Sequence, residues 1–312
     1  MRCLSIVIPV FNEEKNLPLL YKELVEIGRK IPYVLELIFV DDGSTDGSVA
    51  LLKKLQNKDK RVKLVEFTSN FGQTAAFDAG IKMARGEVIA TIDSDLQNDP
   101  ADIPQLLKKL DSGFDVVCGW RVKREDTLEK RAFSLLANFL RRKLTGETIH
   151  DSGCSLRVYK KEVFTGIDLY GEMHRFISAI LTLKGYKIGE VPVHHRKRRF
   201  GKSKYGTIRL LKGLLDLLFI VFLLRFSAKP LHIFGTIGVL IFLVGFVTSV
   251  YLTILKIFFG TMLSNRPLLT LSVLLMVLGT QFFIFGILAE ILIRIYFKTH
   301  SFTPYTIRSK TL

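Results

Sequence analysis

The sequence predicts an α/β domain with a mainly parallel sheet and helices on both faces, followed by an interfacial amphipathic helix and a two-helix transmembrane hairpin. Two observations carry this prediction. Over about the first 120 residues, short runs rich in β-branched side chains alternate with stretches of helical period. Later in the chain, two long stretches contain no charged residue at all.

Each predicted element follows from one of these patterns. We expect strands at 5–10, 35–40, 62–67, 88–92 and 115–118, and helices at 14–30, 48–56, 74–84 and 103–110. Strand, helix and strand joined by short connections give right-handed crossovers and parallel pairing. Apolar strands without alternation, such as 37–40, are typical of a sheet covered on both faces. Residues 121–205 continue this domain, with a helix at 128–144 and a strand at 189–194.

The two uncharged stretches predict transmembrane helices. Residues 233–255 and 267–289 each contain 23 positions without a charge. At 1.5 Å per residue each covers roughly 35 Å, which is enough to cross a hydrocarbon core of ~30 Å. We therefore divide the chain into the α/β domain at 1–205, an interfacial segment at 206–228, two membrane helices within 229–298 (231–258 and 267–293), and a tail at 299–312.

The distribution of charge predicts both a membrane surface and an orientation. Net charge is +16, and the run 196–204 holds six cations beside a Leu-rich amphipathic pattern at 208–219. This arrangement favours anionic lipid head groups or a lipid phosphate over nucleic acid, and a solvated basic face is the alternative. Four cations follow the second helix, whereas the loop 260–266 has a single Arg. The positive-inside rule then places both termini in the cytosol.

The cysteines, the histidines and the N-terminal residues argue against a Cys- or His-based metal site and against a secreted protein. The three cysteines have no metal-ligand spacing and are typical of reduced cytosolic thiols. The pair His194-His195 has no third ligand spaced to complete a metal site, so we interpret these as ordinary strand-end residues. The chain enters a strand pattern directly after Ser5, so we expect no signal peptide.

Two acidic clusters follow predicted strands. Asp93-Ser94-Asp95 ends one apolar strand, and Asp41-Asp42 ends another. The carboxyl ends of parallel strands share one edge of the sheet, where ligands bind. Paired carboxylates at that edge suit a hard divalent cation that keeps open positions for phosphate oxygens, although an isolated D-x-D is often only a solvated turn. No dinucleotide fingerprint or P-loop is present, so metal and cations must hold any phosphate.

Taken together, these motifs resemble glycosyltransferase family 2, which has the Rossmann-like GT-A fold. Later motifs resemble the polyprenyl-phosphate glycosyltransferases among them, and the resemblance extends over the whole chain. The motifs are 5–14, 40–46, 70–73, 93–97, 151–157, 172–176 and 200–205. The Q-x-x-R-W signature of processive synthases is absent, which favours transfer of a single sugar.

The resemblance implies a role for individual residues. Nucleotide binding maps to Pro9, Phe11, Glu13, Asp41, Asp42, Ser94 and Arg121, with Asp42 first and Asp41 second as candidates for the base. Asp93, Asp95 and Gln97 match the group that holds Mg²⁺ or Mn²⁺. Asp151 matches the acid near the reacting centre, so Asp93, Asp95 and Asp151 are the catalytic candidates. Arg198 and Lys204 match a basic loop that closes over phosphates, and with Arg175 they are our candidates for the acceptor phosphate.

The function implied is a metal-dependent, inverting transfer of one sugar from a UDP- or GDP-sugar to dolichyl or undecaprenyl phosphate at the cytosolic membrane face. A lipid phosphate has a second pKa near ~6, so it needs no strong general base. Two alternatives remain: a membrane glycosyltransferase with a glycolipid hydroxyl acceptor, and a non-enzymatic adaptor that has lost its chemistry. We also expect a homo-oligomer and no nucleic-acid partner.

Overall fold

The computed structural model describes residues 2–122, 145–169, 171–197, 230–260 and 267–299. These residues fall into two compact units, one ending before residue 198 and the other beginning at Pro230. Each unit is described by itself. The predicted helix at 128–144 and the whole interfacial segment at 206–228 lie outside the described residues.

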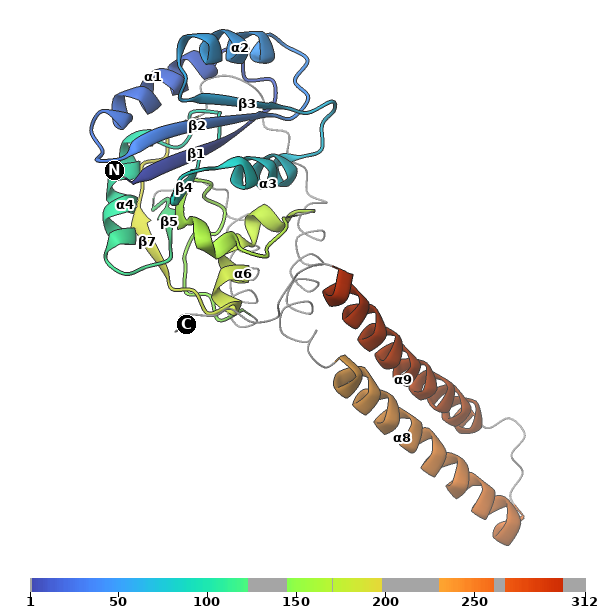
Figure 1. Cartoon of the computed structure of the whole chain (residues 1–312). Coiled ribbons are helices and arrows are strands. Elements are labelled where there is room, and N and C mark those ends of the chain that lie inside the picture. Colours follow the sequence, from blue (N-terminus) through green and yellow to red (C-terminus); the bar gives the residue numbers. More distant parts are fainter. Residues whose placement is uncertain (1, 123–144, 170, 198–229, 261–266, 300–312) are drawn as a thin grey trace. The chain divides into compact units, whose positions relative to one another are not determined.

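The first unit is built on a seven-stranded sheet (Figure 1). Its strands are β1 (Cys3–Val10), β2 (Val34–Asp41), β3 (Val62–Glu66), β4 (Val88–Thr91), β5 (Val116–Trp120), β6 (Arg157–Lys160) and β7 (Ile188–Pro192). They are arranged in the order β3-β2-β1-β4-β6-β5-β7. β6 alone runs antiparallel to its neighbours β4 and β5. The mainly parallel sheet is therefore confirmed, and the five early strands lie close to their predicted positions.

Helices cover both faces of this sheet. They are α1 (Leu17–Gly28), α2 (Ser48–Lys58), α3 (Gln73–Met83), α4 (Ile103–Asp111) and α6 (Ile177–Leu183). Leucines of α1, α2 and α4 share one core with inward-facing residues of β1 and β2, and α3 covers the other face (Figure 1). Ile6, Ile8 and Phe39 in that first core are fully buried. Each such side chain contributes about 1.5–3 kcal/mol relative to an exposed one.

The structure differs from the sequence prediction in three respects. α1 begins at Leu17 rather than residue 14, because Glu13 to Asn16 form a turn closed by the Asn16 N–H and the Glu13 carbonyl at 2.9 Å. The strand β6 and the short helix α6 were not predicted. β7 ends at Pro192 rather than residue 194, because the His194 N–H leaves the ladder and donates to Asp102 Oδ2 at 2.7 Å.

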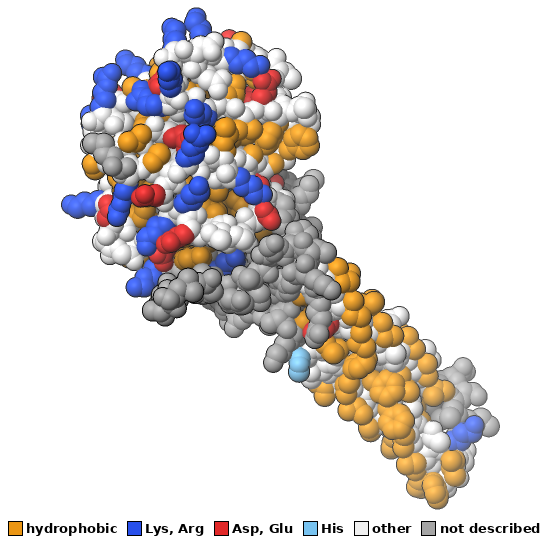
Figure 2. Space-filling model, in the orientation of Figure 1, with side chains coloured by type: hydrophobic (Ala, Val, Ile, Leu, Met, Phe, Trp, Pro, Cys, Tyr) orange, Lys and Arg blue, Asp and Glu red, His pale blue; other side chains and the backbone are white. Residues whose placement is uncertain are grey.

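The second unit is a hairpin of α8 (Pro230–Phe259) and α9 (Pro267–Thr299), and hydrophobic side chains cover its visible surface in Figure 2. Both helices contain a stretch that is long and apolar enough to cross a membrane, at Pro230–Phe259 and Pro267–Ile293, with a mean hydropathy of 2.4 and 2.3. Glycines allow close contact between them: a Cβ on Gly238 would lie 2.6 Å from the Gly279 carbonyl oxygen. Ser249 Oγ donates to Ser272 Oγ at 3.0 Å, which adds a hydrogen bond across the same interface.

Candidate active site

The carboxyl ends of β1 and β4 are joined at one edge of the sheet. Ser94 Oγ donates to the Pro9 carbonyl at 2.8 Å, and both residues are buried. The chain then turns sharply at Leu96, which adopts a φ of 61°. This left-handed turn starts the 97–99 loop directly after the acidic pair. The hydrogen bond from Ser94 to Pro9 fixes the position of the two neighbouring carboxylates.

Asp93 and Asp95 form an acidic pair just beyond the end of β4. Asp93 Oδ1 accepts a hydrogen bond from Gln73 Nε2 at 2.6 Å, and Asp95 Oδ1 accepts from the Gln97 backbone N–H at 3.1 Å. Burial, followed by the nearby charge of Asp95, raises the pKa of Asp93 to about 6. Two carboxylates are thus held close together in a place where their mutual repulsion is poorly screened.

The donor set fits a hard divalent cation. The carboxylate oxygens of Asp93 and Asp95, with an amide at Gln97, are the ligand types that Mg²⁺ and Mn²⁺ take. A cation there would relieve the repulsion that raises the Asp93 pKa. The described part of the chain contains no group of three or more His, Cys, Asp or Glu side chains arranged to hold a metal ion. A ligand set of two carboxylates and one amide leaves coordination positions open for phosphate oxygens.

The acidic end of β2 has two distinct carboxylates. Both oxygens of Asp42 are engaged by backbone N–H groups, from Phe71 at 2.7 Å and from Gly72 at 3.0 and 3.1 Å. Burial raises the pKa of Asp42. Asp41 Oδ2 accepts from the Ser44 N–H at 2.9 Å, whereas its buried Oδ1 has no hydrogen-bond partner among the described residues. Asp42 therefore anchors a loop, and Asp41 retains the open acceptor atom.

Hydrogen bonds connect the loop after β1 to the loop after β2. Asn12 adopts a φ of 58°, and its side-chain oxygen accepts from the Thr45 N–H at 2.8 Å. The Glu13 N–H donates to Ser48 Oγ at 3.0 Å, and Phe11, directly after β1, is half-buried. These bonds hold the two loops, which carry residues predicted to bind the nucleotide, against each other.

Arg121 and Asp151 are paired with each other. The guanidinium Nε and Nη2 lie 2.6 and 2.9 Å from the two carboxylate oxygens, and the side chains are only 12% and 4% exposed. Two parallel charge-assisted bonds of this kind are strong and fix both partners in orientation. Glu190 Oε1 accepts from the Asp151 N–H at 3.1 Å and so supports the same turn. The predicted nucleotide-binding residue Arg121 and the predicted acid of the reacting centre, Asp151, thus form one unit.

Comparison with known proteins identifies the family. The family model described as "Glycosyl transferase family 2" matches residues 5–167. A dodecaprenyl-phosphate galacturonate synthase of Rhizobium johnstonii is 40% identical over 98% of this chain and 92% of the relative. The chain belongs to glycosyltransferase family 2. The family and the enzyme class expected from the sequence are confirmed.

Other relatives and solved structures agree with this assignment. An undecaprenyl-phosphate 4-deoxy-4-formamido-L-arabinose transferase of Pectobacterium atrosepticum is 37% identical over 94% of this glycosyltransferase and 88% of the relative. A glucosyl-3-phosphoglycerate synthase of Mycobacterium tuberculosis, solved with Mn²⁺, UDP-glucose and phosphoglyceric acid, superimposes with a TM-score of 0.54. That match covers 70% of this chain and 80% of the other at 18% identity, so it concerns the fold alone.

Arg157 is a residue of this glycosyltransferase that sequence reasoning missed. It is buried in β6, and its guanidinium donates to the carbonyls of Cys154 at 2.7 Å, of Ser152, and of His174 at 3.5 Å. The Asp151 turn is therefore folded around a central cation. The only signal in the sequence was an arginine at the end of the 151–157 motif, without any pattern that marked it as buried.

The candidates for the acceptor phosphate are only partly described. Arg175 forms an ion pair with Glu172 at 2.7 Å and is 23% exposed. Arg198 and Lys204 lie outside the described residues. The segment that leads to them is attached to the 97–99 loop, because the Arg196 N–H donates to the Gln97 carbonyl at 2.8 Å. The Arg196 guanidinium also forms ion pairs with Glu23 at 2.9 Å and Asp99 at 2.6 Å.

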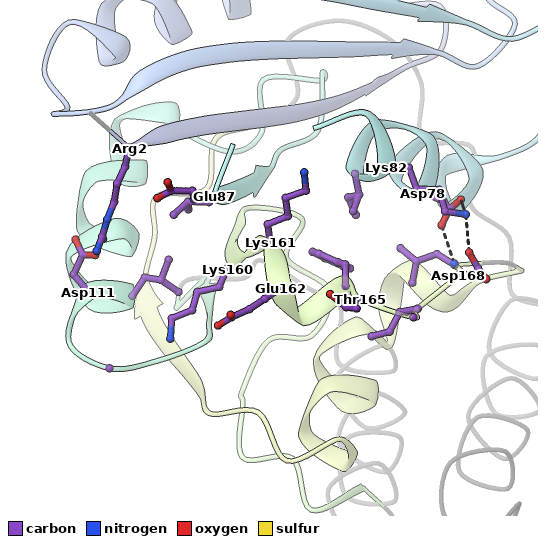
Figure 3. Close-up of a pocket in the computed structure, with 18 residues that line it drawn as sticks. Arg2, Asp78, Lys82, Glu87, Asp111, Lys160, Lys161, Glu162, Thr165 and Asp168 are labelled. Atoms are coloured by element: carbon purple, nitrogen blue, oxygen red, sulfur yellow. Dashed lines mark hydrogen bonds and ion pairs between the residues drawn. The ribbon is translucent and has the colours of Figure 1, made fainter. Parts of the chain in front are cut away.

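A separate pocket of about 900 Å³ lies away from this site (Figure 3). Its lining includes Arg2 and Glu87, which precede β1 and β4, so it is at the amino edge of the parallel strands. Charges in it neutralise one another: Arg2 pairs with Asp111 at 2.9 Å, and Lys82 lies between two aspartates in the right of the view. This pocket shares no lining residue with the acidic pair of the glycosyltransferase.

Proposed function

We propose that this glycosyltransferase transfers one sugar from a nucleoside-diphosphate sugar to a polyprenyl phosphate, with inversion at the sugar C1 and with Mg²⁺ or Mn²⁺ bound at Asp93 and Asp95. The observation that carries the proposal is the acidic pair at the end of β4, in a chain that aligns over 98% of its length with a dodecaprenyl-phosphate galacturonate synthase. That alignment reaches beyond the family domain at 5–167 and takes in the apolar hairpin.

The donor would bind along the carboxyl edge. Pro9, Phe11 and Glu13 with Asp41 would contact the nucleoside, where the unpaired Asp41 Oδ1 is a hydrogen-bond acceptor for a base N–H. Asp93, Asp95 and Gln97 would hold the cation, which would neutralise charge on the leaving diphosphate. M. tuberculosis glucosyl-3-phosphoglycerate synthase has been solved with Mn²⁺ and UDP-glucose, and a similar donor for this chain is consistent with the shared fold.

The protein's part in the chemistry would be orientation rather than proton removal. A lipid phosphate with a second pKa near ~6 is largely ionised at pH 7 and can attack C1 without a general base. Attack from the face opposite the leaving diphosphate forms the new C1–O bond as the old one breaks, which inverts C1. The Arg121–Asp151 pair would fix the wall beside that centre, and correct positioning alone contributes several kcal/mol to such reactions.

The acceptor would remain in the bilayer. The apolar hairpin would anchor the enzyme, and Arg198 and Lys204 with Arg175 would hold the lipid phosphate. The positive-inside rule favours a cytosolic catalytic domain and cytosolic termini. The homo-oligomer expected from the sequence is a separate proposal, which size-exclusion chromatography with light scattering would test.

The test uses the purified full-length protein in detergent or nanodiscs with Mg²⁺ or Mn²⁺, undecaprenyl or dolichyl phosphate, and a panel of UDP- and GDP-sugars. We expect one nucleotide sugar to yield a lipid-phosphate sugar, and the product anomer to be opposite to the donor anomer. Chelation should abolish transfer. A product only with a glycolipid hydroxyl acceptor, with a rate that requires a titrating base, would favour the alternative acceptor class.

Acceptor contacts are tested by variants of the basic segment. Arg198→Ala and Lys204→Ala should each lower the single-turnover rate at least tenfold and weaken the dependence on lipid concentration, with a smaller effect on nucleotide-sugar binding. Arg198→Lys should restore activity only in part, because a Lys cannot form bidentate contacts with phosphate. Arg29→Ala removes an exposed cation of the same domain and serves as the control. Loss of nucleotide-sugar binding with unchanged lipid dependence would assign Arg198 and Lys204 to the donor diphosphate instead.

A further inference from the structure

The segment Asn70–Gln73 connects the two acidic strand ends of the site. On one side, the N–H groups of Phe71 and Gly72 donate to the buried Asp42 carboxylate. Asn70 Nδ2 adds a bond to the Asp42 carbonyl at 3.2 Å. Gly72 has a φ of 94°, a conformation that glycine adopts without strain, and the helix α3 begins at the next residue. Asp42 thus fixes the point at which α3 starts.

On the other side, the first residue of α3 reaches the acidic pair. Gln73 Nε2 donates to Asp93 Oδ1 at 2.6 Å, and the Gln73 side chain lies in a half-buried position. The bond uses one carboxylate oxygen of Asp93 and restricts rotation of the carboxylate plane. The Ser155 side chain also forms a hydrogen bond with this carboxyl group, which partly offsets the rise in its pKa caused by burial, so Asp93 is oriented from two sides. A chain of contacts therefore runs from Asp42 through the loop and Gln73 to Asp93.

We propose that Gln73 is a positioning residue for the metal ligand Asp93, held in place by Asp42 through the 70–72 loop. This inference rests on the proposed cation site. A neutral amide suits the role, because it donates a hydrogen bond to the carboxylate without adding a positive charge that would compete with the cation. Partners of this kind orient a metal ligand, and their removal typically weakens metal affinity or activity by about 10–100-fold.

The experiment measures Mn²⁺ affinity directly in the full-length protein. Free Mn²⁺ is followed by electron paramagnetic resonance during titration, in the presence of whichever of UDP or GDP the wild-type protein binds. Gln73→Met removes the amide while keeping a side chain of similar length and helix propensity. Gln105→Met is the matched control, because Gln105 Nε2 of α4 makes the same kind of bond to Asp102 Oδ1 at 2.9 Å.

We expect Gln73→Met to bind Mn²⁺ about tenfold or more weakly, with the Gln105→Met affinity unchanged. Transfer by Gln73→Met should recover at high Mn²⁺, which a general structural defect would not allow. Wild-type Mn²⁺ affinity in Gln73→Met would overturn the inference. So would a melting temperature, measured in chelator, that falls far below that of Gln105→Met, because Gln73 would then support the fold. If the wild-type protein itself binds no Mn²⁺ with nucleotide, the proposed cation site fails instead.

Discussion

Replacing Asp93 by Asn should stabilise the metal-free protein while abolishing transfer. The folded structure raises the pKa of Asp93 from 3.8 to about 6, through burial first and the charge of Asp95 second. The folded state therefore binds more protons than the unfolded state between these pH values, and stability falls as pH rises through that window. At about 1.4 kcal/mol for each pH unit, the charge of Asp93 costs up to about 3 kcal/mol above pH 7.

Asn is close to Asp in shape, and its side-chain oxygen can still accept from Gln73 Nε2. The assay is thermal unfolding of the full-length protein in detergent with excess chelator, at pH 4.5, 6 and 7.5. A gain of about 3 kcal/mol corresponds to roughly 6–12 °C for a domain of this size. We expect the variant to melt close to wild type at pH 4.5 and several degrees above it at pH 7.5.

Two results would refute this reasoning. A variant that melts at or below wild type at pH 7.5 would show that the acidic pair is not under electrostatic strain without a cation. A variant that keeps substantial transfer activity would remove Asp93 from the cation site altogether. Added Mn²⁺ with nucleotide should raise the melting temperature of wild type and leave the variant unchanged, since ligand binding stabilises only a folded state that can bind.

Three further predictions follow from the same structure. Asp151→Asn leaves the buried Arg121 guanidinium without its carboxylate. The free energy of unfolding should fall by about 3–5 kcal/mol, as for other broken buried pairs, and the single-turnover rate should fall with it. A wild-type rate and melting curve would contradict this. Gly279→Leu should separate α8 from α9, because even a Cβ at this position would lie 2.5 Å from a backbone nitrogen of α8. Val277→Leu, which is 49% exposed on the hairpin surface, is the control, and detergent stability is the measurement. A cysteine introduced at Asn265 should react with an impermeant maleimide only from outside the cell, and labelling from the cytosolic side alone would reverse the proposed topology.

The parallel part of the sheet was predictable because each strand carries its own signal. Runs such as 37–40 are apolar throughout and are bounded by turn residues, so their position and burial follow from local composition. The rule that ligands gather at the carboxyl ends then placed Pro9, Asp41 and Asp93 at one edge, as the structure shows.

β6 could not be predicted because its character depends on distant partners. It is only four residues long, and it begins with Arg157, a charged residue that would ordinarily indicate a surface position. Carbonyl groups of the 151–154 turn and of His174 satisfy that charge, and the turn itself is shaped by Arg157. Burial of such a group is a property of the finished fold, since a lone charge in the interior would be strongly unfavourable.

The pairing of Arg121 with Asp151 could not be predicted from the sequence for a similar reason. The two residues are 30 positions apart, and each matched a separate motif. The motifs assign a role to each residue in isolation, Arg121 in nucleotide binding and Asp151 near the reacting centre. They carry no information on which charges neutralise one another. The same applies to Asp42, whose carboxylate meets the backbone of a loop 29 and 30 residues further along the chain.

The place of β6 in the sheet determines the order in which the domain can be completed during synthesis. β6 lies between β4 and β5, yet it follows both in the chain. In a nascent chain that has reached Trp120, β4 therefore lacks one partner strand and β5 lacks both, and residues 121–156 must be made before the strand that joins them. Exposed strand edges pair readily with other chains. A truncated protein that stops before Arg157 would retain the whole acidic pair, and it should aggregate instead of forming a soluble enzyme.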